Sequence, residues 1–322
     1  RGWAVKVTPD GKMIPVCSGL RSPGGVGPNA QGVMFCIESQ GPWNGCCSLK
    51  HLKQGAFLGH PASYNWYPFV PGLDAPAVEP DSPSRLQVEK KRVKELVPPV
   101  VRFPYIRMGR SIAGFRLNQT GGKFGPFENQ IFLGDYTLSI ILRVTTEQVN
   151  GVWQGACYPF REGLSTGIMH VEFSPRGQLI VGGFTTNRQW PVRGTEPFAI
   201  QRIDWSGVVP FEIREINIRK DGFLVTFTKP VDRGIASGTE TYTVTTYTHN
   251  YAAGYGSPEV DHTTPEVIRA VPSADGLSVM VRLDKTTEGH IHDFDLAGMV
   301  GRDGERLLHT KAYYTVNEIP DH

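Results

Sequence analysis

The sequence has no marked excess of charge of either sign. Its 322 residues include 33 Lys and Arg against 31 Asp and Glu, which gives a formal net charge of +2. Binding to nucleic acid requires a concentration of basic residues that this balance does not provide, so we do not expect nucleic acid as a partner. An apolar run of about 18 residues is also lacking, so no membrane-spanning helix is predicted.

Cysteine is scarce, and its spacing excludes two common kinds of site. The five cysteines are Cys17, Cys36, Cys46, Cys47 and Cys157, and no CxxC pattern links them. This excludes zinc-ribbon and c-type haem sites within the chain. We expect buried thiols at the first two positions. The other three lie in glycine-rich stretches that we interpret as loops, where one disulfide stays an open alternative.

The amino-terminal stretch lacks the features of a signal peptide. RGWAVKVTPDGK has no starting Met and no charged segment followed by an apolar one. It has instead the pattern of a strand, a turn and a second strand. We therefore expect the sequence to begin inside a fold, after processing or truncation.

Turn-forming residues, by contrast, are abundant. The chain contains 37 Gly and 25 Pro, together with 39% hydrophobic and 20% charged residues. Such a composition is typical of a folded protein rather than a disordered one. Because so many turn residues require short, closely spaced elements, the composition favours an all-β architecture.

Three segments share one pattern, which is a short strand, a glycine turn, a second strand, a loop and a third strand. The segments are residues 25–55, 112–151 and 168–207. Their predicted second strands are Val33–Glu38, Gln130–Asp135 and Gln178–Gly183, and their predicted third strands are Ser48–Lys53, Ser139–Thr145 and Phe198–Asp204. A period of about 40 residues is typical of β-propeller blades.

The repeat count is too low for a closed propeller. Residues 5–20 have the pattern of the outer strands of a preceding blade, so residues 1–207 contain about three blades and a remnant. Closed propellers usually have about four to eight blades. We therefore predict part of a six-bladed propeller, whose missing blades come from the rest of the protein or from another chain.

An irregular insertion at residues 67–104 separates the first two repeats. Its beginning is rich in proline, and the stretch SRLQVEKKRVKEL predicts one short helix with Ser82 or Ser84 as its N-cap.

The pattern changes in residues 208–322. Phe223, Val225 and Phe227 alternate with polar residues, and the tripeptides KDG and ADG are hairpin-turn signals. About seven short strands in this length predict an immunoglobulin-like β-sandwich. Its predicted core is Phe211, Ile213, Phe223, Val225, Phe227, Val279, Val281 and Leu283. We expect this part to fold as a separate domain without catalytic groups.

At this level of detail the chain resembles a known family. GLRSPGGVGPNAQGVMFCIESQGPWNG followed by KQGAFLGHP, then RMGRSIAGFRL, and then GIMHVEFSPRGQLIVGG, resemble successive later blades of the glucose/sorbosone dehydrogenase propellers. The stretch AYYTVNEIP resembles the closing motif of large planctomycete- and verrucomicrobium-type members with an added sandwich. The resemblance implies a periplasmic or secreted bacterial protein. It also implies carbohydrate as a candidate partner.

The family's cofactor, pyrroloquinoline quinone, is rich in carboxylates and is held there by a Lys and a pair of Arg residues. The corresponding positions here read Asp135-Tyr136-Thr137 and Gly167-Ile168-Met169-His170, and an expected acidic pair reads Cys46-Cys47. The blade that would hold the catalytic His is not in the chain. The expected cationic ligands are therefore missing, and the cofactor of this chain stays unknown.

Five polar residues are candidates for a site at the propeller mouth: His60, Arg107, Arg110, Asp135 and His170. Asp135 could hold a cation or a sugar hydroxyl, and the alternative is a strand-end Asp with hydrogen bonds to its turn. The two arginines could grip an anionic substrate or pair with a neighbouring carboxylate. His60 could be a base or a packed loop residue, and His170 could face the central channel.

A His-x-His pattern in GHIHDFDL raises the question of a metal site. His290 and His292 would share one face of a strand, with Asp293 and Asp295 on the other. A single strand is weak evidence for a metal site, and we interpret this stretch as an exposed polar face. No metal is predicted.

Two functions follow from these observations. The first is an extracytoplasmic oxidoreductase of sugars or polyols with its site at the propeller mouth. The second is a non-catalytic carbohydrate-binding or assembly module on the same scaffold. The missing cationic ligands favour the second for this chain, whereas the resemblance favours the first for a whole protein.

Overall fold

The computed structural model describes residues 2–185 and 190–321. Strands dominate this part of the chain, and the helices are short: η1 (Pro61–Phe69), α1 (Leu86–Arg92), α2 (Arg233–Ser237) and η2 (Thr239–Thr241). The predicted all-β class is thus confirmed. None of the helices in the described residues has the length and apolar character needed to cross a bilayer.

The amino-terminal half contains a hairpin and three meandering sheets, in which consecutive strands pair. The hairpin consists of β1 (Trp3–Val7) and β2 (Met13–Ser18). The first sheet contains β3 (Pro23–Pro28), β4 (Met34–Glu38), β5 (Cys47–His51) and β6 (Val101–Phe103). The second contains β7 (Ile112–Leu117), β8 (Ile131–Asp135), β9 (Ile140–Val149) and β10 (Val152–Arg161). The third contains β11 (Ile168–Phe173), β12 (Leu179–Phe184) and β13 (Phe198–Ile203).

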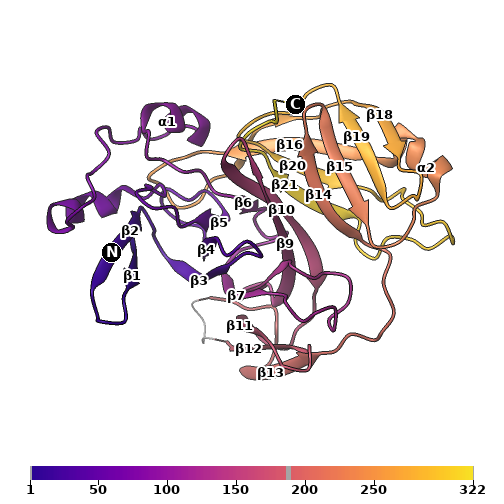
Figure 1. Cartoon of the computed structure of the whole chain (residues 1–322), viewed down its shortest axis with the longest axis horizontal. Helices are drawn as coiled ribbons and strands as arrows, with labels where there is room; N and C mark the ends of the chain where they lie inside the picture. The colour runs from indigo at the N-terminus through magenta and orange to yellow at the C-terminus, as the bar shows by residue number, and fades with distance from the viewer. Residues whose placement is uncertain (1, 186–189, 322) are drawn as a thin grey trace.

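The first strands of these sheets lie side by side in the lower part of Figure 1, where β7 contacts both β3 and β11. Glycine permits this close approach. A Cβ at Gly27 of β3 would lie 2.3 Å from the ring of Phe115 on β7. A Cβ at Gly114 of β7 would lie 3.1 Å from Val171 of β11, and Gly114 also has a φ of +70°, which favours glycine.

The predicted second strands coincide with β4, β8 and β12 to within one residue. The expectation of three strands per repeat was incomplete, because the first two sheets have a fourth strand. One of these, β6, lies inside the expected irregular insertion at 67–104. The insertion therefore ends in a regular strand, which pairs with β5 through Leu49↔Val101.

The predicted helix in this insertion is confirmed as α1, but its expected cap is wrong. The N-cap residue is Arg85, and it makes no side-chain capping hydrogen bond. The Ser84 hydroxyl instead donates to Glu89 at 2.6 Å, and the Ser82 hydroxyl accepts from the amide of Ala253 at 2.9 Å.

The carboxyl-terminal half contributes strands to two sheets. A four-stranded sheet has the order β14 (Ile213–Arg219), β15 (Gly222–Phe227), β19 (Ser278–Leu283) and β18 (Val267–Pro272). The KDG turn joins β14 to β15 as predicted, and Gly222 has a φ of +147° there. The other strands are β16 (Thr243–His249), β17 (Glu259–Thr263), β20 (Ile291–Asp295) and β21 (Lys311–Thr315). The described part of this half thus has eight strands, where about seven were expected.

These last four strands continue the second sheet of the amino-terminal half. The resulting eight-stranded sheet has the order β17-β16-β20-β21-β10-β9-β8-β7. Its junction is the antiparallel pairing of β10 with β21, where Ala156 lies opposite Tyr314. The expected domain boundary between residues 207 and 208 stays a prediction, and a continuous hydrogen-bonded sheet runs across it (Figure 1).

The largest buried cluster also spans the two halves. It contains every residue of the core predicted for the 208–322 region, which confirms the predicted strand register there. It also contains Ala156 and Tyr158 of β10. Because both sheets supply side chains to one core, the side chains of the carboxyl-terminal half are buried partly by the amino-terminal half.

All five cysteines fall within the described residues, and all are buried free thiols. The alternative of a disulfide among Cys46, Cys47 and Cys157 is therefore wrong. Cys46 lies in the loop before β5, as expected, whereas Cys47 lies on β5 and Cys157 lies on β10.

Candidate functional site

Asp135 ends β8 and is completely buried. One carboxylate oxygen accepts hydrogen bonds from the amides of Arg110 at 2.7 Å and Ser111 at 2.8 Å. The other accepts from the amide of Leu138 at 2.8 Å. The carboxylate thus holds the loop before β7 against the turn between β8 and β9, and it supplies acceptors for the buried amide of Leu138 and the half-buried amides of Arg110 and Ser111.

This arrangement brings two of the predicted site residues together, but through the backbone of one of them. The amide of Arg110, rather than its guanidinium, contacts Asp135. A carboxylate that already accepts three backbone hydrogen bonds has little capacity left for a cation or a sugar hydroxyl. The geometry therefore matches the turn role considered for Asp135.

The side chain of Arg107, in the loop between β6 and β7, contacts the carboxyl-terminal strands. Its guanidinium pairs with Glu259 of β17 and lies 3.4 Å from a carboxylate oxygen of Asp293 on β20. It also donates to the hydroxyl of Tyr247 on β16 at 2.7 Å, with its charge over that ring at 5.4 Å. Arg107 therefore joins the loop between β6 and β7 to the carboxyl-terminal strands, and its charge is already matched by two carboxylates.

The two predicted histidines lie in different settings. His60 is the N-cap of η1, and its Nδ1 accepts from the amide of Ala62 at 3.2 Å. His170 is exposed on β11 opposite Gly182. The structure thus joins Arg110 to Asp135, and it places Arg107 and His60 in contacts of their own.

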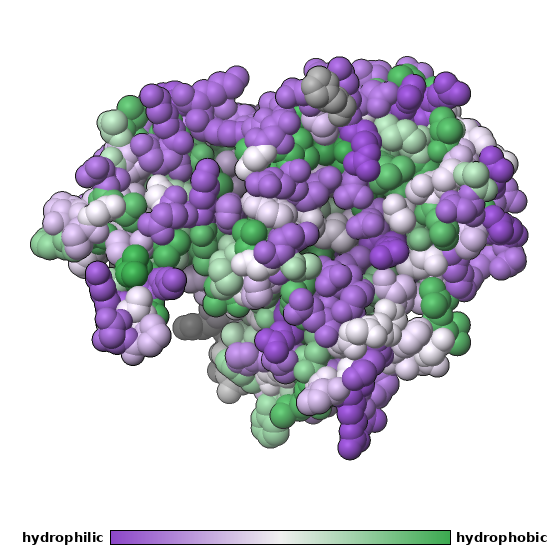
Figure 2. Space-filling model, in the orientation of Figure 1, coloured by the Kyte–Doolittle hydropathy of each residue, from purple (hydrophilic) through white to green (hydrophobic). Residues whose placement is uncertain are grey.

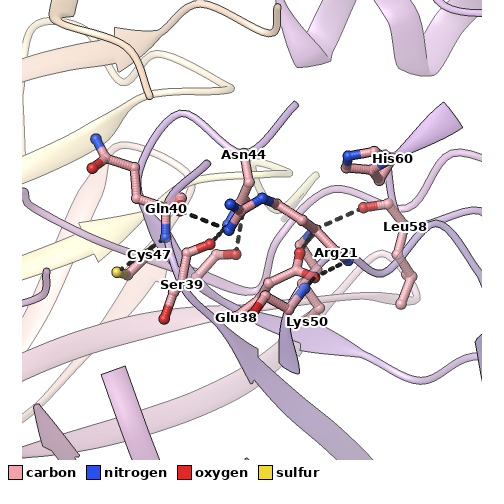
Figure 3. A network of polar contacts seen from close by, with 12 residues as sticks. Arg21, Glu38, Ser39, Gln40, Asn44, Cys47, Lys50, Leu58 and His60 are labelled. Carbon is pink, nitrogen blue, oxygen red and sulfur yellow. Dashed lines mark hydrogen bonds and ion pairs between the residues drawn. The ribbon is translucent and has the colours of Figure 1, made fainter. Parts of the chain in front are cut away.

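Figure 3 shows a polar network beside His60 that the sequence analysis did not identify. Glu38, at the end of β4, pairs with Lys50 of β5, and the side chains of both are almost completely buried. The second carboxylate oxygen of Glu38 accepts from the amides of Arg21 and Ser22, at 3.0 Å for Ser22. Lys50 Nζ also donates to the carbonyl of Leu58 at 2.9 Å. The network fixes the loop before β3 and the loop after β5 to one sheet.

The positions that correspond to the family's quinone ligands contain no Lys and no Arg. Asp135 is buried and accepts from backbone amides, and Ile168 is completely buried. Burial raises the pKa of the Cys46 and Cys47 thiols to about 12, so both are neutral near pH 7. The residues present therefore do not fit a cofactor with several carboxylates.

The GHIHDFDL stretch is not an exposed polar face, as was expected. His292 is completely buried, with its ring 5.1 Å from that of Phe223, and Asp293 is nearly buried. His292 belongs to the core between the two sheets of the carboxyl-terminal half. Within the described residues no group of three or more His, Cys, Asp or Glu side chains is placed to hold a metal ion.

Comparison with known proteins gives little further guidance. No family model and no curated protein matches the chain. One solved structure with some similarity is a protein of the bacterium Thermus thermophilus assigned as an oxidoreductase (glucose dehydrogenase). The two share 17% sequence identity over 59% of this chain and 46% of that chain, with a TM-score of 0.36. A likeness at this level does not establish a shared fold or activity.

Proposed function

We propose that this chain is a non-catalytic assembly module, namely a partial six-bladed propeller with an immunoglobulin-like sandwich, which further blades of the same kind complete. The observation that carries the proposal is the apolar surface left uncovered at both ends of the row formed by β3, β7 and β11.

One of these surfaces belongs to β13. The third sheet has three strands within the described residues, whereas the first has four, and β13 pairs there only with β12. Its side chains Phe198 and Ile200 are 77% and 83% exposed. An open strand edge flanked by exposed apolar side chains is a surface for another strand or sheet.

The other surface lies between the β1–β2 hairpin and η1. A hollow of about 430 Å³ there is lined almost entirely by apolar side chains, among them Trp3, Met13, Trp66 and Phe69. Three of these, Met13, Trp66 and Phe69, are between 47% and 76% exposed. Figure 2 shows apolar surface near the hairpin, at the left, and near β13, at the lower edge.

The occupant that we propose is a propeller blade, because the sheets of this chain already cover each other through their first strands. The second sheet covers the first through β3 and β7, and the third covers the second through β7 and β11. A blade at either end would continue the same packing. The resemblance to sugar dehydrogenase propellers supports the same scaffold and an extracytoplasmic location, and it supports carbohydrate as a candidate ligand of the complete assembly.

Hydroxyl-radical footprinting of the isolated 322-residue chain and of the protein purified from its natural source would test this proposal. We expect Met13, Trp66 and Phe198 to be oxidised rapidly in the isolated chain and to be protected in the native protein. Leu308, which is 63% exposed outside both surfaces, is the control and should react equally in both. Equal oxidation of all four residues in the two samples would overturn the proposal.

A further inference from the structure

A small cavity adjoins the network of Figure 3, because Asn44 and Lys50 of that network also line it, together with Arg102 of β6 and His249 at the end of β16. Its volume is about 20 Å³. The polar side chains that line it include Asn44, Lys50, Arg102, His249 and the thiol of Cys46, and all of these are buried. Cavities that stay empty in proteins are lined by apolar groups, so a lining with this many polar groups indicates that the cavity holds a bound molecule or ion.

Arg102 brings a positive charge to this cavity without a protein counter-ion among the described residues. It is 3% exposed. One terminal nitrogen donates to the hydroxyl of Thr248 at 2.9 Å and to the carbonyl of Gly289 at 3.0 Å. Its Nε is buried without a hydrogen-bond partner in the described part of the chain. Arginine stays protonated in proteins, so this charge is buried and uncompensated, which is costly.

The neighbouring groups do not supply the missing negative charge. Glu38 lies next to the cavity, but its carboxylate already forms an ion pair with Lys50. Burial raises the pKa of the Cys46 thiol to about 12, so the thiol is neutral. Burial also raises the pKa of Tyr251, whose hydroxyl donates to the carbonyl of Gly59.

His249 adds a second unmatched donor. It is 5% exposed, and neither ring nitrogen has a hydrogen-bond partner among the described residues. Burial lowers its pKa to about 3, so the ring is neutral near pH 7 and has one N–H. The cavity is therefore lined by two side chains, Arg102 and His249, that each have an unused N–H donor.

The missing group must be negative, must accept hydrogen bonds and must be small. A cavity needs roughly 10–15 Å³ to hold one water-sized particle, so this cavity has room for about one. A carboxylate, phosphate or sulfate group is too large, and a water molecule would leave the charge of Arg102 unmatched. We propose that the cavity binds a single chloride ion, held by Arg102 and His249.

Bound chloride would join the two halves of the chain. Arg102 belongs to β6, and His249 ends β16 beyond the expected domain boundary. Because only the folded chain assembles this pair of donors, chloride binding would stabilise the folded state in a saturable way. This inference does not depend on the assembly proposed above.

The direct test is crystallisation of the full chain with sodium bromide and anomalous diffraction at the bromine edge. We expect one bromide peak within hydrogen-bonding distance of Arg102 Nε and a ring nitrogen of His249. A peak elsewhere only, or an ordered water molecule alone in this cavity, would overturn the proposal.

Thermal unfolding gives an independent measurement. At constant ionic strength we expect the midpoint to rise with chloride or bromide and to level off, and not to rise with gluconate. His249→Phe should weaken the apparent chloride affinity at least tenfold. His292→Phe is the matched control, because His292 is also buried with an unpartnered Nδ1 but does not line the cavity, and it should leave that affinity unchanged. Equal midpoints in chloride and gluconate for the wild-type chain would contradict the proposal.

Discussion

Ala156 of β10 and Tyr314 of β21 lie opposite each other in one antiparallel ladder, although they come from opposite sides of the expected domain boundary. Neighbouring pairs on the same ladder join Gly155 to Thr315 and Cys157 to Tyr313. A continuous ladder transmits local unfolding from one half to the other, because its hydrogen bonds are lost together. The two halves should therefore unfold as a coupled unit.

Phe227→Ala tests this coupling. Phe227 is 2% exposed in the core of the carboxyl-terminal half, and its removal should cost roughly 3–5 kcal/mol in unfolding free energy. All six tryptophans lie before residue 208, so tryptophan fluorescence reports on the other half. We expect the urea midpoint measured by this fluorescence to fall in the variant.

Ile268→Ala, at a position 54% exposed, is the control and should leave the midpoint nearly unchanged. An unchanged midpoint in Phe227→Ala, with loss of structure by circular dichroism, would mean that the halves unfold independently.

Asp135→Ala should destabilise the chain by roughly 3 kcal/mol, because it leaves the buried amide of Leu138 and the half-buried amides of Arg110 and Ser111 without their acceptor. Asp135→Asn should cost less, since the amide oxygen can still accept. Urea unfolding of the full chain is the measurement. The control is Asp204→Ala, which removes an exposed carboxylate paired with Arg202 and should cost under about 1 kcal/mol. A cost for Asp135→Ala as small as that of the control would reopen a binding role for this carboxylate.

Lys50→Met should cost roughly 3–5 kcal/mol, because it leaves the buried carboxylate of Glu38 without its cation. The double variant Glu38→Gln with Lys50→Met should lose less than the sum of the two single variants. A comparison is Lys229→Met, which breaks a more exposed pair with Glu305 and should cost about 1 kcal/mol or less. Additive effects in the double-mutant cycle would show that the buried pair has no coupling energy.

The buried His292 should make stability fall in acid. Burial lowers its pKa to about 3, below the ordinary value of about 6.5 for an unfolded chain. Its contribution is therefore complete above pH 6.5 and is lost as the pH falls from 6.5 towards 3. At pH 5 the loss should be about 2 kcal/mol. His292→Gln should flatten the dependence of unfolding free energy on pH between 7 and 5. Parallel curves for wild type and His292→Gln would contradict this assignment.

The chain should not bind pyrroloquinoline quinone tightly, because the positions where the resemblance places its ligands hold a buried carboxylate and neutral thiols. The measurement is an absorbance titration with the cofactor and calcium, followed by a dye-linked assay for aldose oxidation. A functional quinoprotein dehydrogenase serves as the positive control. Stoichiometric binding with turnover would refute the prediction and restore the oxidoreductase function for this chain.

Local patterns in the sequence determine where most strands lie and which side chains face the core. Alternation places Phe223, Val225 and Phe227 on one face, and all three are buried. Such patterns succeed because they depend on residues two positions apart and on turn chemistry at the strand ends. Arg102 offered a weaker signal, as one charged residue within the apolar run VPPVVRFP.

Tertiary structure alone decided how the strands were joined and what the polar residues contacted. Alternation specifies a face but no partner, so it could not predict that β21 would pair with β10 rather than close a separate sandwich. The ion pair between Arg107 and Glu259 likewise depends on a loop and a strand that only the folded chain brings together. Burial also set the roles of Asp135 and His292, because water is removed from them by segments distant in the sequence.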